Sequence, residues 1–191
     1  MTRATGVTGT TGVTVMTGAT GATGEAEPSA ECTCVAQMRN IIRQIIKIYV
    51  TNTVLVFMES WDIASGRPGA LFPPPDSNPN AGLFLLVSAQ DVIQETVNIC
   101  RIAAIRVNTA TYNEDITYLP VPAPALTGCE ADCEAAIRTY LHVGANASVK
   151  VGGQTVASGE VIQSQFGMTV ITDGNDVTFV SNCKAEIITL S

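Results

Sequence analysis

The chain has 191 residues, enough for one domain or two small ones with a buried core. Seventeen acidic residues against ten basic ones give a formal net charge of −7. This balance argues against a nucleic-acid partner, because phosphate backbones are bound by clustered Lys and Arg. A single His leaves little material for His-based metal sites or nucleophile–His pairs. We therefore expect no enzymatic activity, no catalytic residue, no metal and no cofactor.

Two features of the chain point to different compartments. Residues 1–24 lack the cationic start and apolar stretch of a secretory signal, and no segment reaches the ~18 apolar residues of a membrane span. We expect neither a signal peptide nor a membrane partner. Six cysteines, in contrast, favour an oxidising environment. Both features are satisfied if the protein is made in a cytosol and leaves the cell by another route.

Residues 1–26 form an arm with a period of three residues. Its glycines share one register, Val15 replaces one of them, and Thr fills the third place of six triplets. Glycine at every third position is typical of a collagen triple helix, where no other residue fits the crowded axis. The alternative is a flexible Gly/Thr tail. The glycines are Gly6, Gly9, Gly12, Gly18, Gly21 and Gly24, and the threonines are Thr8, Thr11, Thr14, Thr17, Thr20 and Thr23.

This run, over residues 5–26, resembles the collagen-like surface proteins of bacterial endospores, which form exosporium layers and appendages. The resemblance implies synthesis in the mother cell and a place on the spore surface, extracellular after mother-cell lysis. It also implies self-association as a trimer or filament, with other spore-coat proteins as further partners. O-glycosylation of the six threonines is a further implication.

Residues 27–31 are predicted to be a linker, and a helix is expected from Cys32. Val35, Met38, Ile42, Ile45 and Tyr49 recur at intervals of three and four residues. This spacing fits a coiled-coil seam between copies or an amphipathic helix packed on its own domain.

β-branched and aromatic residues predict the strands that follow. In residues 32–108 we expect strands at 49–58, 71–72, 83–88 and 95–107, a turn at 66–69 and a Pro/Asn loop at 72–82. After a Pro-rich linker at 109–128, we expect a helix at 129–141 and strands at 148–156, 159–165, 168–173 and 177–190.

The two predicted units, 32–108 and 129–191, can be overlaid by their cysteines. Each has two Cys at its helix start and one in its last strand, followed by a basic residue. The overlay favours an internal duplication. The predicted fold is mainly β with short helices: a collagen-like segment followed by two small barrels that resemble, in pattern, Sm-like or SH3-like domains. A single jelly-roll head is the alternative.

Three roles for the cysteines remain open. Disulfides would tie helix start to last strand in each half, or link neighbouring subunits. A zinc site from Cys32, Cys34, Cys129 and Cys133 has acceptable ligands but unusual spacing. Reduced cysteines buried in the core are the third possibility. The disulfide candidates are Cys32, Cys34, Cys100, Cys129, Cys133 and Cys183.

Other polar and aromatic candidates are weaker. Trp61 fits either a partner contact or a core position. We expect His142 at a helix end, acidic residues near the helix start for its dipole, and a hairpin turn at 173–176. The sequence thus favours a structural, self-assembling subunit of a spore-surface fibre or exosporium layer, held by strand or arm exchange and disulfides. The alternative is a trimeric adhesive or ligand-binding head on a short collagen-like stalk.

Overall fold

The computed structural model describes residues 29–74 and 80–191, in two halves with the same order of elements. Each half has one helix, five strands and a 3-10 turn before the fifth strand. The first half contains α1 (Ala30–Ile48), β1 (Val54–Met58), β2 (Ile63–Phe72), β3 (Leu83–Val87), β4 (Ile93–Asn98), η2 (Ile99–Arg101) and β5 (Ile102–Val107). The second contains α2 (Cys129–Tyr140), β6 (Asn146–Val151), β7 (Gln154–Gln165), β8 (Met168–Thr172), β9 (Val177–Ser181), η3 (Asn182–Lys184) and β10 (Ile187–Leu190).

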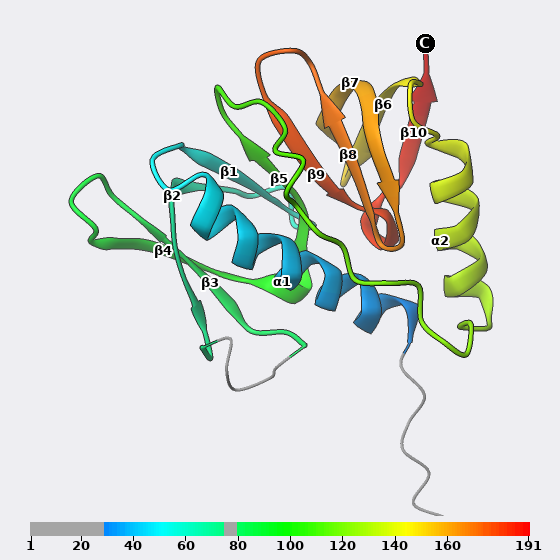
Figure 1. Cartoon of the computed structure of the whole chain (residues 1–191), viewed down its shortest axis with the longest axis horizontal. Coiled ribbons are helices and arrows are strands. Elements are labelled where there is room, and N and C mark those ends of the chain that lie inside the picture. Colours follow the sequence, from blue (N-terminus) through cyan, green and yellow to red (C-terminus); the bar gives the residue numbers. More distant parts are fainter. Residues whose placement is uncertain (1–28, 75–79) are drawn as a thin grey trace, which may run out of the picture.

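The ten strands form one antiparallel sheet in the order β10-β6-β7-β8-β9-β5-β1-β2-β3-β4. In each half the fifth strand therefore comes first, followed by strands one to four. The halves meet at β9 and β5, and β10 and β4 lie at opposite ends of the sheet (Figure 1). The expected mainly β fold with short helices is confirmed, whereas one sheet differs from the two sheets of a jelly roll. The collagen-like arm, with its glycines and threonines, lies outside the described residues.

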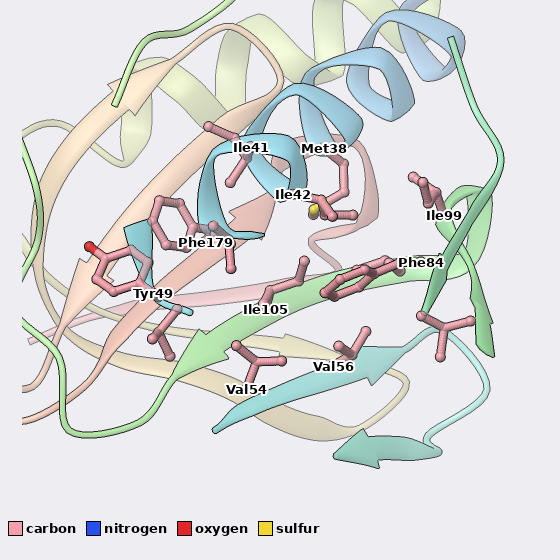
Figure 2. Close-up of a cluster of buried hydrophobic side chains, with 14 of the residues drawn as sticks. Met38, Ile41, Ile42, Tyr49, Val54, Val56, Phe84, Ile99, Ile105 and Phe179 are labelled. Atoms are coloured by element: carbon pink, nitrogen blue, oxygen red, sulfur yellow. The ribbon is translucent and has the colours of Figure 1, made fainter. Parts of the chain in front are cut away.

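Helix α1 begins at Ala30, inside the predicted linker, because Ser29 caps it: the Ser29 hydroxyl accepts a hydrogen bond of 3.1 Å from the Cys32 N–H. The apolar face of α1 packs on its own chain, and Ile41 and Ile42 are fully buried. Figure 2 shows Met38, Ile41 and Ile42 above Val54, Val56 and Ile105 of the strands. The heptad-like spacing thus reflects an amphipathic helix. Among the described residues, neither helix is long and apolar enough to cross a membrane.

The buried side chains form two clusters, and each draws on both halves. The larger cluster joins α1 and the strands of the first half to Met168, Val170, Val177 and Phe179 of the second. The smaller one joins Phe57 of β1 to strands of the second half. The halves therefore share a core and are packed as one body.

Two predictions in the first half were wrong. Residues 49–53 form a turn rather than part of a strand, because α1 continues to Ile48 and Tyr49 is its C-cap, with its N–H still bonded to the Ile45 carbonyl. Residues 66–69 lie within β2 instead of forming a turn. Here glycine serves close approach between strands: a Cβ on Gly69 would lie 2.7 Å from the Leu85 carbonyl oxygen of β3.

The predicted last strand of each half is interrupted. Residues 95–107 comprise the end of β4, η2 and β5, and residues 177–190 comprise β9, η3 and β10. In the first half the Asn98 side chain accepts a hydrogen bond of 3.0 Å from the Cys100 N–H, which stabilises the 3-10 turn. The last cysteine of each half, Cys100 or Cys183, therefore lies in a turn between two strands.

The first part of the Pro-rich linker at 109–128, up to Leu119, is held along α1 by hydrogen bonds. The Gln37 carboxamide oxygen accepts from the Leu119 N–H at 2.9 Å, and the Gln44 oxygen accepts from the Thr117 N–H at 2.8 Å. The Asn40 amide donates to the Thr117 carbonyl at 2.8 Å. Polar residues on α1 thus hold the linker in place across the helix.

Glu134 fixes α2 to the second half. Its side chain is fully buried, and Oε1 accepts hydrogen bonds from the Gly167 N–H at 2.9 Å and the Asn182 amide at 3.0 Å. Arg138, one turn further along the helix, lies 3.3 Å from the same oxygen. The place of Glu134 near the helix start predicts only an interaction with the helix dipole, so this buried role was not predicted.

We expect Glu134→Ala to lower the free energy of unfolding by about 1–3 kcal/mol, because it leaves two buried donors without an acceptor. Urea denaturation followed by circular dichroism measures the change. Glu130→Ala is the matched control, since Glu130 lies exposed on the same helix. Equal, small effects of the two variants would contradict the role given to Glu134.

Candidate assembly interface

The joint between the halves is the pairing of β9 with β5. Its antiparallel register runs from Ala104 opposite Val180 to Val107 opposite Val177. All residues of β9 are buried, as are all of β5 except the partly buried Arg106. Arg106 lies over the Phe57 ring, 5.2 Å from its centroid, and donates to the Val156 carbonyl at 3.0 Å. The joint is thus packed like the interior of a sheet.

A disulfide crosses the joint. Cys34 of α1 is bonded to Cys183 of η3, with the two Cα atoms 6.2 Å apart. The expectation of a disulfide is confirmed, but the expected pairing within each half is wrong for these two residues, since they belong to different halves. The bond also removes Cys34 from the four-cysteine zinc alternative.

Charged side chains reinforce the same joint. Lys184 of η3 lies 2.6 Å from a carboxylate oxygen of Glu31 and 2.6 Å from one of Glu59. Arg101 of η2 binds the other Glu59 oxygen at 3.1 Å. The Lys184 side chain is only 9 % exposed, so its charge depends on these acidic partners.

The ion pairs shift the pKa values of both partners. Burial acts to raise the pKa of Glu59, but hydrogen bonds from Lys184 and Arg101 outweigh it, and the pKa lies below its ordinary value. Burial acts to lower the pKa of Lys184, but Glu31 and Glu59 favour the charged form, and the pKa is raised. The network is therefore fully charged near neutral pH.

The two outer strands, β4 and β10, each have one edge without a strand partner in the described residues. Five of the six residues of β4 are exposed, and no residue of β10 is fully buried. Ile93 and Ile187 are 58 % and 52 % exposed. Their counterparts in the other half, β9 and β5, form the buried joint. The fourth and fifth strands of a half are thus paired where the halves meet, as β9 with β5, and unpaired on one edge at the two ends of the sheet, as β4 and β10.

Four cysteines form no disulfide in this structure. Cys32, Cys129 and Cys133 are exposed, and Cys100 is partly buried in η2. Cys129 and Cys133 line a hollow of about 590 Å³ between α2, η3 and the chain leading into β10. Glu130, Glu186 and the disulfide-bonded Cys183 also line it. The hollow therefore combines two thiols with acidic walls, and Glu31, Glu59 and Lys184 of the joint also line it.

Trp61 lies on the surface at the turn between β1 and β2, with its side chain 68 % exposed and a positive φ of 72°. Of the two alternatives from the sequence, the core position is therefore wrong. Its ring covers Gly152 of the β6–β7 turn, where a Cβ would overlap the indole. Trp61 thus bridges the two halves on the outside.

The remaining candidates have ordinary structural roles. His142 follows α2, with Nδ1 3.2 Å from the Tyr140 carbonyl oxygen. The carboxylate of Asp173 accepts from the N–H groups of Asn175 and Asp176 in the β8–β9 turn, which holds its pKa below the usual range. Sequence reasoning missed Lys184 and Glu59; the signal for Lys184 was the basic residue that follows the cysteine in each half.

No model of a known protein family matches this chain, and neither does any curated protein or solved structure. The candidate site therefore rests on the chain's own geometry.

We expect Cys34→Ser with Cys183→Ser to lower the unfolding free energy by about 2–5 kcal/mol, because the disulfide closes a long loop in the unfolded chain. Guanidinium denaturation with and without reductant measures it. Cys32→Ser is the control and should behave like the wild type. A wild-type stability that reductant does not change would contradict this prediction.

We expect Lys184→Met to cost about 1–3 kcal/mol near neutral pH, because Glu59 loses a charge-assisted hydrogen bond. The Glu59 contribution is present above its ordinary pKa of 4.5 and is lost as the pH falls through the lowered folded-state value. The Lys184 contribution is present below 10.5 and is lost only above the raised pKa. The stability difference should therefore be constant between these limits and shrink in acid. Lys47→Met, at an exposed position, is the control.

Proposed function

We propose that this chain is a structural, self-assembling subunit of a bacterial spore-surface fibre or exosporium layer. Copies join edge to edge, β10 of one copy to β4 of the next. One observation carries the proposal: β4 and β10 are open and exposed, whereas the equivalent strands β9 and β5 pair inside the chain.

The internal joint supplies a template for the joint between copies. The overlay that places Cys100 on Cys183 also places β4 on β9 and β5 on β10. Transferring the β5–β9 register to the outer strands sets Ile187 opposite Val97 and Leu190 opposite Gln94. Such a contact uses two different surfaces of the chain, so it repeats from copy to copy as a ring or a filament.

The proposal extends to the fold of each half. A helix followed by five antiparallel strands, with a 3-10 turn before the last strand, supports a small barrel of the Sm-like or SH3-like kind. Such small folds serve many functions, so this likeness says nothing about activity. The acidic net charge of −7 supports a structural role over nucleic-acid binding.

The arm, residues 1–26, supports the cellular setting. Its triplets resemble collagen-like spore-surface proteins, and in our proposal three arms associate or insert between neighbouring copies. The disulfide across the joint supports a place outside the cytosol, where such bonds persist. Immunogold labelling of intact spores should show the chain at their surface.

A second candidate, an adhesive head on a collagen-like stalk, is favoured by Trp61, because an exposed indole on a rigid turn suits a ligand contact. Electron microscopy separates the two candidates. Discrete heads on stalks favour adhesion, and continuous fibres or layers favour the structural subunit.

The test of edge pairing is Ile187→Lys, which places a charge where the proposed joint would bury an apolar side chain. Light scattering and negative-stain microscopy should show multimers for the wild type and single chains for the variant. Val121→Lys is the matched control, since Val121 is 52 % exposed in the linker and belongs to neither outer strand.

Circular dichroism must show that both variants are folded. Wild-type protein that stays a single chain across a wide concentration range would refute self-assembly. Multimers that persist in Ile187→Lys would refute pairing through β10.

A further inference from the structure

Cys100 and Cys183 occupy equivalent places in the two halves. Each is the middle residue of the 3-10 turn between the fourth and fifth strands, and each is followed by a basic residue. Cys183 extends across the joint and bonds to Cys34 on the helix of the other half. Cys100 has the same position at the open end of the sheet but forms no disulfide within this chain.

Helix α2 presents thiols on the corresponding face. Both helices end with the C-cap N–H bonded to the carbonyl four residues earlier, at Tyr49 in α1 and Leu141 in α2. Aligning these ends places Cys129 where α1 has Gln37. The Gln37 side chain already crosses the joint, since its amide donates to the Phe166 carbonyl of the second half at 2.9 Å. Cys129 therefore lies on the helix face that, in α1, meets the other half.

The hollow beside α2 marks the place of the missing neighbour. The corresponding face of α1 is covered by two parts of the second half, the β7–β8 turn and η3. A Cβ on Gly167, in that turn, would lie 3.2 Å from the Cα of Cys34. In the second half the corresponding face of α2 borders the hollow lined by Cys129 and Cys133, which Glu31 and Glu59 of the first half line from another side. Of its acidic residues, Glu130 has no ion pair among the described residues, and Arg101, which follows Cys100, keeps a side chain that is 70 % exposed while it pairs with Glu59 of its own chain.

We propose that Cys100 of one copy forms a disulfide with the thiol pair Cys129 and Cys133 of the next, Cys129 being the nearer by helix alignment. This inference rests on the proposed edge-to-edge assembly and names its covalent lock. Between copies the bond corresponds to the Cys34–Cys183 bond within each copy, with its helix cysteine about one turn further along the helix.

The reaction needs an oxidant, and a low-molecular-weight disulfide supplies it. The Cys129 thiolate attacks one sulfur of the small disulfide, forming a mixed disulfide and releasing one small thiol. The Cys100 thiolate then attacks the Cys129 sulfur, which forms the link and releases the second small thiol. Two protein thiols are oxidised, one small disulfide is reduced, and the two protons end on the two small thiols.

The experiment mixes ¹⁵N-labelled and unlabelled full-length chain that share the intact Cys34–Cys183 bond, in a buffer of oxidised and reduced glutathione. Mass spectrometry of the non-reduced digest then identifies linked peptides. We expect Cys100 linked to Cys129 or Cys133, with pairs that combine one labelled and one unlabelled peptide. Cys34–Cys183 pairs should carry a single label.

Variants assign the link. Cys100→Ser, and Cys129→Ser combined with Cys133→Ser, should each abolish the ladder of covalent multimers on non-reducing gels. Cys32→Ser, which changes another exposed thiol, should leave the ladder intact. Light scattering under reducing conditions reports non-covalent assembly in every variant.

Each outcome decides a separate point. If multimers form while Cys100 stays unlinked, or while it links to Cys100 or Cys32 of another copy, the proposed disulfide is refuted. Self-assembly itself is then still supported. Multimers without this disulfide are also expected if the arm of a neighbouring copy, and not β4, pairs with β10. Single chains under both reducing and oxidising conditions overturn the lock and the proposed function together.

Discussion

The pairing of β9 with β5 is the constraint on which the rest of the structure depends. It joins two five-stranded halves into one sheet, and both buried clusters contain residues from each side of it. Helix α1 lies across the joint and is held there by the Cys34–Cys183 bond and the Lys184 ion pairs. Separating the halves would expose core residues such as Phe179 to water, so neither half is complete alone.

The outer strands β4 and β10 have the same positions in their halves as the paired strands β9 and β5, but they are exposed. A strand position that is buried in one half is exposed in the other, although the order of elements is the same. Native sheets usually protect open edges with charges, proline or bulges. Here β4 carries Glu95 and a register shift near Ile93, while β10 carries no charge. The difference makes β10 the surface more in need of a partner.

The sequence predicted the mainly β class, the helix at Cys129 and the amphipathic face of α1, because these depend on local periodicity and turn residues. It predicted only the last two residues of β2, because Gly66 and Gly69 signal turns but serve close contact with β3. Its disulfide alternatives, within each half or between subunits, did not include a bond between the halves, because spacing along the chain says nothing about which half lies beside which. Glu134 was missed for a similar reason: its partners, Gly167 and Asn182, are distant in sequence.

The single arm per chain has a consequence for stoichiometry. In the proposed assembly each copy contributes two five-stranded units and one arm, so a closed ring contains one arm for every two units. A collagen triple helix needs three strands in register. A ring of three chains satisfies both conditions, whereas a ring with any number of chains not divisible by three leaves at least one arm unmatched.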